Sequence, residues 1–130
     1  MGDIVSVGCT SCIYQKDFQL GTGILYGELS HYLVTSRLSG KAMQDELLGR
    51  MESGEYTQCR EQLYRCPGCG TLCARFYGEV RGKRRTYHTR HRCHRCNRYL
   101  EMLEPAAING SSCPRCEEGV LYYRISGSWD

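Results

Sequence analysis

The stretch Cys93-His-Arg-Cys96, followed after sixteen residues by Cys113-Pro-Arg-Cys116, decides the fold of this chain. The same spacing occurs twice upstream, in Cys9-Thr-Ser-Cys12 and Cys66-Pro-Gly-Cys69. Each pair places two thiolates across a tight turn, within reach of one ion that sulfur holds at about 2.3 Å. Four pairs supply two tetrahedral sites, so the sequence predicts two structural Zn²⁺ ions. The eight predicted ligands are Cys9, Cys12, Cys66, Cys69, Cys93, Cys96, Cys113 and Cys116.

The four cysteine pairs can share two ions in more than one way. The sixteen-residue gap between Cys96 and Cys113 is typical of a zinc ribbon, so the spacing favours sequential pairing. In that arrangement the first two pairs share one ion and the last two share the other. In the nested alternative, the second pair shares an ion with the third, and the first pair shares the other ion with the fourth. Both arrangements predict the same eight ligands.

The length of 130 residues fits a single domain that spans 1–130. Much of the hydrophobic content is ten Cys and ten Tyr, so a large aliphatic core is not expected. A structural zinc site can contribute about 10–16 kcal/mol of apparent binding free energy to folding. The metal-free protein is therefore expected to be largely unfolded.

A disulfide framework is the competing interpretation of ten cysteines. The chain begins Met1-Gly2-Asp3 without the basic segment and apolar run of a secretory signal, and equal two-residue gaps suit metal-binding turns. Zinc is therefore preferred over disulfides and over iron in the same sites. No apolar stretch reaches about 18 residues, so we expect no membrane contact and a reducing, cytoplasmic location.

The predicted fold is a small metal-bound α+β domain with two zinc ribbons, which are β-hairpins that end in paired-cysteine turns, and an inserted αα-hairpin. Residues 4–20 predict two strands around the first cysteine pair. Residues 28–54 predict the helical insertion, in which Ser39 can cap a helix with Met43 and Met51 on one face. Residues 62–125 predict a β-rich part that contains the other three cysteine pairs. The tail 126–130 has no element pattern and is expected to fray.

Two cysteines and three histidines stand outside the paired pattern. Cys59 and Cys73 are interpreted as small buried apolar residues, and Cys73 is also a candidate reserve ligand or redox-reactive thiol. The histidines that flank the third pair are His88, His91 and His94. Because eight cysteines already complete two sites, the histidines are not predicted to be ligands.

The layout also carries a family likeness. It rests on Gly21-Thr-Gly23-Ile-Leu-Tyr26, on Tyr64-Arg-Cys66-Pro-Gly-Cys69-Gly70, and on the last two cysteine pairs. In this order and spacing the chain resembles a group of small, uncharacterised bacterial zinc-ribbon proteins over most of its length. The resemblance implies the ribbon fold and no particular activity. Ile13 and Asn97 depart from the pattern, because glycine often follows the second cysteine of such a turn.

The charge of the chain is segregated. Residues 81–98 hold eight Arg or Lys, three His and no acidic residue, whereas the remainder holds nine basic against fourteen acidic residues. Basic side chains on phosphates and tyrosines stacked on bases are how small modules bind nucleic acid, and Tyr87 and Tyr99 punctuate the segment. The candidate nucleic-acid-binding residues are Arg81, Lys83, Arg84, Arg85 and Arg90. The opposing interpretation is that Arg92 and Arg95 neutralise thiolate sites.

These features favour a zinc-binding module that is not an enzyme and that binds DNA or RNA through the cationic hairpin 81–98. One alternative is a protein-interaction adaptor that presents the helical hairpin to a protein partner, and another is a redox-sensitive zinc switch. Complete sets of four cysteines leave no open coordination position, so neither catalysis nor a small-molecule substrate is expected. The identity of the partner and the oligomeric state stay open.

Overall fold

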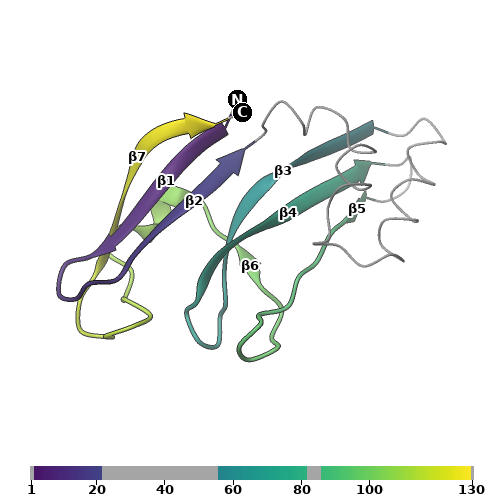
Figure 1. The fold of residues 1–130 in the computed structure, drawn as a ribbon. Helices are drawn as coiled ribbons and strands as arrows, with labels where there is room; N and C mark the ends of the chain where they lie inside the picture. The colour runs from purple at the N-terminus through teal and green to yellow at the C-terminus, as the bar shows by residue number, and fades with distance from the viewer. Residues whose placement is uncertain (1, 22–55, 82–85, 130) are drawn as a thin grey trace.

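The computed structural model describes residues 2–21, 56–81 and 86–129, which form an antiparallel β-sheet (Figure 1). Its strands are β1 (Gly2–Cys9), β2 (Gln15–Gly21), β3 (Tyr56–Arg65), β4 (Leu72–Arg81), β5 (Thr86–His88), β6 (Glu101–Met102) and β7 (Leu121–Trp129). A short 3-10 helix, η2 (Pro105–Ile108), lies between β6 and β7. The strand order is β5-β4-β3-β2-β1-β7, and β6 pairs with β3 outside this path.

The sheet divides into two ribbons. The first ribbon is β7, β1 and β2, and the second ribbon is β3, β4 and β5. A single residue pair, Gly21 with Glu61, joins β2 to β3. Figure 1 shows the two ribbons side by side, with the chain termini together at one end and the turns that connect the strands at the other. The cysteine pairs lie in these turns, so the fold gathers them at one end of the sheet.

The expected α+β class is wrong for this chain, because the residues that the structure describes are mostly antiparallel sheet and contain no α-helix. The predicted helical insertion, 28–54, lies outside the described residues. In the region predicted to be β-rich, 62–125, the first strand, β3, begins at Tyr56. The predicted strands on either side of the first cysteine pair are confirmed.

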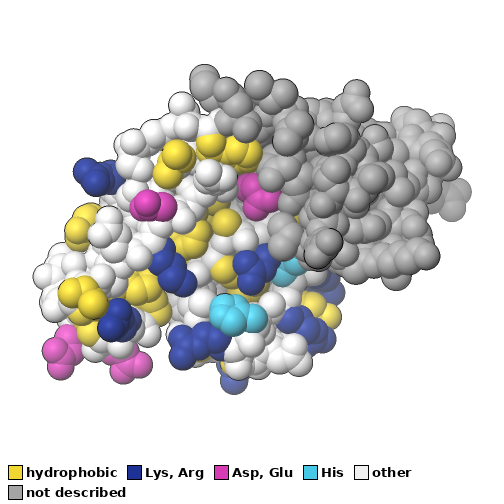
Figure 2. Space-filling view, in the orientation of Figure 1, with side chains coloured by type: hydrophobic (Ala, Val, Ile, Leu, Met, Phe, Trp, Pro, Cys, Tyr) yellow, Lys and Arg dark blue, Asp and Glu magenta, His cyan; other side chains and the backbone are white. Residues whose placement is uncertain are grey.

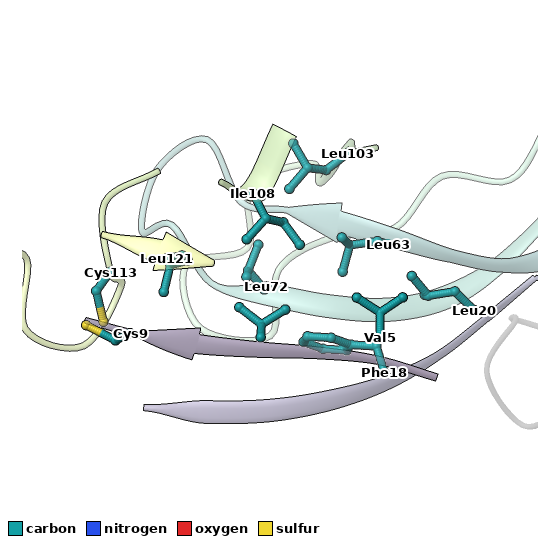
Figure 3. Packing of buried hydrophobic residues seen from close by; sticks show 11 residues of the cluster. Val5, Cys9, Phe18, Leu20, Leu63, Leu72, Leu103, Ile108, Cys113 and Leu121 are labelled. Atoms are coloured by element: carbon teal, nitrogen blue, oxygen red, sulfur yellow. The ribbon is translucent and has the colours of Figure 1, made fainter. Parts of the chain in front are cut away.

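One hydrophobic cluster lies between the two ribbons. In β2, buried Phe18 and Leu20 alternate with exposed polar residues, as expected for a strand with one face on a core. Leu63 in β3 and Leu72 in β4 contribute from the second ribbon. Figure 3 shows these side chains gathered between the strands, with Ile108 from η2 beside them. The core therefore depends on both ribbons and is continuous with the cysteine turns, because Cys9 and Cys113 belong to the same cluster.

The C-terminal strand β7 pairs with β1 along the edge opposite to β2. A Cβ at Gly2 would lie 2.4 Å from the backbone carbonyl of Leu20 and against the Trp129 indole, so this position needs glycine. A Cβ at Gly8 would lie 2.6 Å from the hydroxyl of Tyr122. The Trp129 indole N–H donates a hydrogen bond of 3.0 Å to the carbonyl of Leu20. The expectation that 126–130 would fray is wrong through Trp129, because the strand pairing of β7 continues to that residue.

Candidate metal centres

The structure brings the eight paired cysteines into two groups of four. The first centre contains Cys9 and Cys12, from the turn between β1 and β2, and Cys113 and Cys116, from the turn before β7. The second centre contains Cys66, Cys69, Cys93 and Cys96, from the β3–β4 turn and from the turn after β5. Within each group all the sulfur atoms lie within 4.8 Å of one another. Each group could therefore hold a metal ion.

This grouping is the nested arrangement, so the favoured sequential pairing was wrong. The third cysteine pair meets the second because β6, which follows it, pairs with β3 at Tyr64 and Arg65. The fourth pair meets the first because β7, which follows it, pairs with β1 over its whole length. Strand pairing therefore overrides the short sequence gap between Cys96 and Cys113.

The distances between sulfur atoms fit a tetrahedral ion. A Zn–S bond of about 2.3 Å implies sulfur atoms about 3.8 Å apart. In the first centre, Cys9 and Cys116 are 3.6 Å apart and Cys12 and Cys113 are 3.7 Å apart. In the second centre the Cys69–Cys93 distance is 3.6 Å and the Cys66–Cys96 distance is 3.1 Å. All exceed the disulfide bond length of about 2.05 Å, and all eight cysteines are free thiols.

Each cysteine pair lies in a short β-hairpin with a repeated hydrogen-bond pattern. The backbone N–H of the first cysteine donates across the turn to a carbonyl five or six residues later. These bonds are Cys9 to Tyr14 at 3.2 Å, Cys66 to Thr71 at 3.0 Å, Cys93 to Arg98 at 2.7 Å and Cys113 to Gly119 at 3.0 Å. The pattern holds both sulfurs of a pair on the same side of the turn.

Backbone amides point at the sulfur atoms. The N–H groups of Ser11, Arg95 and Arg115 donate to the first cysteine of their turns at 3.3–3.4 Å. The N–H groups of Tyr14 and Gly119 donate to Cys12 and Cys116, both at 3.4 Å. Such bonds favour the thiolate form, which is the form that binds metal.

The residue after the second cysteine takes a left-handed conformation in three of the turns. Its φ is +75° at Gly70, +62° at Asn97 and +60° at Glu117. The departure at Asn97 therefore leaves the turn geometry intact, because asparagine tolerates this region better than most residues. Glu117 adopts the same left-handed conformation without that advantage. The sequence pattern did not predict a left-handed residue at this position.

Hydrogen bonds to the sulfur atoms lower the pKa of some of the thiols, whereas burial and the neighbouring thiols raise the pKa of others. The Thr71 hydroxyl lies 3.1 Å from the sulfur of Cys69 and lowers the pKa of that thiol to about 6. The Gly119 amide lowers the pKa of Cys116 to about 7. The amide of Tyr14 favours the Cys12 thiolate, but burial and the other three thiols of the centre outweigh it and raise the pKa of Cys12 to about 12. Four adjacent thiolates thus need a cation, which is what a divalent metal supplies.

The remaining cysteines and histidines have other surroundings. Both centres consist of cysteine alone among the described residues. His91 hydrogen-bonds through Nε2 to the carbonyl of Phe76 at 2.6 Å, and its ring meets Tyr64 edge to face, so it packs rather than ligates. Cys73 is buried, as expected for a small apolar residue, and burial raises the pKa of its thiol. The side chain of Cys59 lies outside the described part.

The predicted nucleic-acid-binding residues are only partly described. Lys83, Arg84 and Arg85 lie outside the described residues. Arg81 forms an ion pair with the buried carboxylate of Glu79, which also accepts a hydrogen bond of 2.5 Å from the Tyr77 hydroxyl. Arg90 lies over the ring of Tyr99, 5.1 Å from its centroid. Arg92 lies 4.1 Å from the same centroid and donates a hydrogen bond to the carbonyl of Asn97.

The fold and the two centres define a β-sheet protein with two four-cysteine groups that could bind metal. A scan against protein-family models, a search of curated proteins and a search of solved structures each found no match to this chain. Among the described residues no helix has the length and apolar character that a membrane span requires.

Proposed function

We propose that this protein is a non-enzymatic module in which two structural zinc ions hold the turns of a β-sheet and a basic surface binds nucleic acid. The sulfur-only donor sets support zinc, because four thiolates at tetrahedral spacing are a common structural zinc environment. With all four positions filled by cysteine, neither ion has a place for a substrate. The proposal fits a reducing compartment such as the cytoplasm, where thiols persist.

The observation that carries the nucleic-acid proposal is the pair of arginines on Tyr99. The guanidinium carbons of Arg90 and Arg92 lie 5.1 and 4.1 Å from the ring centroid, and Tyr99 is 47% exposed. A cation–π contact at an exposed site is worth about 0.5–1 kcal/mol, enough to restrict where each guanidinium lies. Two cations are thus held together at the surface, and neither has an acidic neighbour in the segment 81–98.

The surrounding surface supports the same proposal. Figure 2 shows Lys, Arg and His side chains gathered at the lower centre of the visible face, apart from the acidic side chains at its lower left. The segment 86–98 contributes Arg90, Arg92, Arg95 and Arg98 to the described surface, and Arg92, Arg95 and Arg98 are all exposed. A positively charged cluster attracts the phosphate backbone of a nucleic acid without selecting a base sequence.

The adaptor hypothesis rests on the helical hairpin 28–54, which lies outside the described residues, and no described contact favours it. The redox-switch hypothesis needs a resolving thiol near a centre. Cys73 is the described candidate, and its burial keeps it protonated and poorly reactive. Nucleic-acid binding is therefore the function that the described residues support best.

The test is fluorescence anisotropy of the zinc-loaded protein with labelled single-stranded DNA, RNA and duplex DNA at 50 and 200 mM salt. Affinity should fall with salt, and Arg90→Gln with Arg92→Gln should weaken binding and reduce the salt slope by about 2. Arg124→Gln, an exposed charge in β7, is the control and should change little. Failure of all three nucleic acids to bind at 50 mM salt would refute the proposal.

A further inference from the structure

A cavity of about 310 Å³ is lined by residues from turns of both metal centres. Its lining residues are Tyr14, Lys16, Thr71, Leu72, Arg95, Pro114 and Arg115. This volume is at the lower end of the range for small-molecule sites, about 300–1,000 Å³. The cavity is distinct from the Arg90–Tyr99–Arg92 surface, none of whose residues contributes to it.

The two centres contribute to the lining in the same way. Arg95 and Arg115 occupy the same position in their turns, immediately before the second cysteine, and they belong to different centres. Tyr14 and Thr71 also correspond, because each accepts the hydrogen bond from the first cysteine of its turn. The cavity is therefore a product of bringing the two ribbons together and exists in neither one alone.

The chemistry of the lining is cationic. It contains Lys16, Arg95 and Arg115 and no acidic residue. Across the described ranges, the side chains of these three residues form no ion pair and no hydrogen bond to another side chain. The backbone amides of Arg95 and Arg115 donate to the sulfur atoms of Cys93 and Cys113, each at 3.4 Å, and among the described residues neither guanidinium group donates to a sulfur. The guanidinium groups are therefore not required as hydrogen-bond donors to the metal centres and remain available for an anion.

We propose that this cavity binds a phosphate monoester at the end of a nucleic-acid strand. The inference rests on the proposed function, since it names the part of the nucleic acid that this second site would take. A phosphate monoester carries about −1.5 to −2 charge near pH 7, more than the single charge of a backbone phosphodiester, and so matches a lining with three cationic residues better. Arginine also suits phosphate because its planar donors can bond two oxygens together.

The first experiment compares one labelled single strand with a 5′-phosphate, a 3′-phosphate or hydroxyls at both ends, bound to the zinc-loaded protein. A terminal phosphate should tighten binding about tenfold or more. Lys16→Gln with Arg115→Gln, two lining residues outside the segment 86–98, should abolish that difference while leaving the affinity for the hydroxyl-ended strand within about twofold. The matched pair Arg90→Gln with Arg92→Gln should weaken binding of all the strands equally. Zinc content of each variant checks that both centres remain intact.

The second experiment titrates inorganic phosphate, against chloride at equal ionic strength, into ¹⁵N-labelled wild-type protein. The amides of Thr71, Arg95 and Arg115 should shift along one saturating curve that chloride does not reproduce. Lys16→Gln alone, which leaves the cysteine turns unaltered, should weaken this curve and provides the test if the double variant does not fold.

The outcomes separate the two proposals. If the strands bind with salt-dependent affinity but a terminal phosphate adds nothing, the cavity assignment is wrong and the proposed function stands. If no strand binds but phosphate shifts the three amides, nucleic-acid binding is wrong and the cavity is a site for free phosphate compounds. If neither occurs, both proposals are overturned.

Discussion

The sulfur atoms of Cys9 and Cys116 lie 3.6 Å apart, although 107 positions separate the two residues in the chain. Their neighbours Cys12 and Cys113 meet in the same centre. An ion at this centre would connect the two ends of the chain across the first ribbon. Closing a loop of this length is where a metal cross-link is expected to restrict the unfolded chain most.

Removing cysteines in sets of four should reveal which pairs share an ion. A variant with serine at 9, 12, 113 and 116 loses one centre and should retain about one zinc per chain. A variant with serine at 93, 96, 113 and 116 breaks both centres and should retain none. Zinc analysis after gel filtration measures this, and sequential pairing would give the reverse result.

Glu117→Gly should stabilise the zinc-loaded protein by about 0.5–1 kcal/mol. The left-handed φ of +60° at Glu117 costs a residue with a Cβ about 1–2 kcal/mol, which exceeds the entropy that glycine loses on folding. Glu118→Gly removes the same charge without a left-handed φ to relieve, so it should be neutral or destabilising. Urea unfolding at a fixed free zinc concentration distinguishes them; equal effects of the two changes would argue against strain at Glu117.

Thr71→Val should accelerate zinc loss from the second centre. Without the hydroxyl, the pKa of Cys69 rises above about 6, and protons compete better with the metal. Because metal binding needs the thiolate, the effect should be small at pH 8 and grow as the pH falls towards 6. Zinc transfer to a coloured chelator, followed at several pH values, measures it. Thr71→Ser keeps the hydroxyl and should behave like wild type; a serine variant as labile as the valine variant would exclude the hydrogen bond as the cause.

Tyr14→Phe should leave stability unchanged or raise it by about 1 kcal/mol. The Tyr14 hydroxyl is buried and has no hydrogen-bond partner among the described residues, and burial raises its pKa to about 12. Removing an unsatisfied hydroxyl removes its desolvation cost while the ring keeps its packing. Tyr123→Phe, at a half-buried position in β7, is the control and should be close to neutral. Destabilisation by more than about 1 kcal/mol at Tyr14 would mean that its hydroxyl has a partner.

The local sequence pattern predicted the hairpin around the first cysteine pair, but it did not predict the full length of the C-terminal strand. The strands on either side of Cys9 and Cys12 follow from alternation in 15–20 and from the turn chemistry, and they were predicted. The continuation of β7 to Trp129 was not predicted, because Ser126, Gly127 and Ser128 carry no strand pattern of their own. These residues extend the strand because they pair with β1 and because the Trp129 indole donates a hydrogen bond to the carbonyl of Leu20.

The residues of the candidate site were likewise only partly predictable from the sequence. The eight cysteines of the two groups were predicted from their spacing, whereas the nucleic-acid-binding role of Arg90 stays a prediction. Thr71 and Arg115 were missed, although each carried a signal. Thr71 lies two residues after the second cysteine of its turn, where its side chain can reach that sulfur. Arg115 repeats the position of Arg95 in another turn, which marks a feature common to both centres.

The sequence by itself determined which cysteines can act together in pairs, because a two-residue gap brings two sulfurs across one turn whatever the rest of the chain does. Only the tertiary structure decided which pairs meet and that Lys16, Arg95 and Arg115 line one cavity. The physical reason is that loop-closure entropy rises slowly with length, so the shorter loops of sequential pairing favour it over nested pairing by only about 1 kcal/mol. Pairing of β7 with β1 and of β6 with β3, together with burial of the core between the ribbons, outweighs that preference.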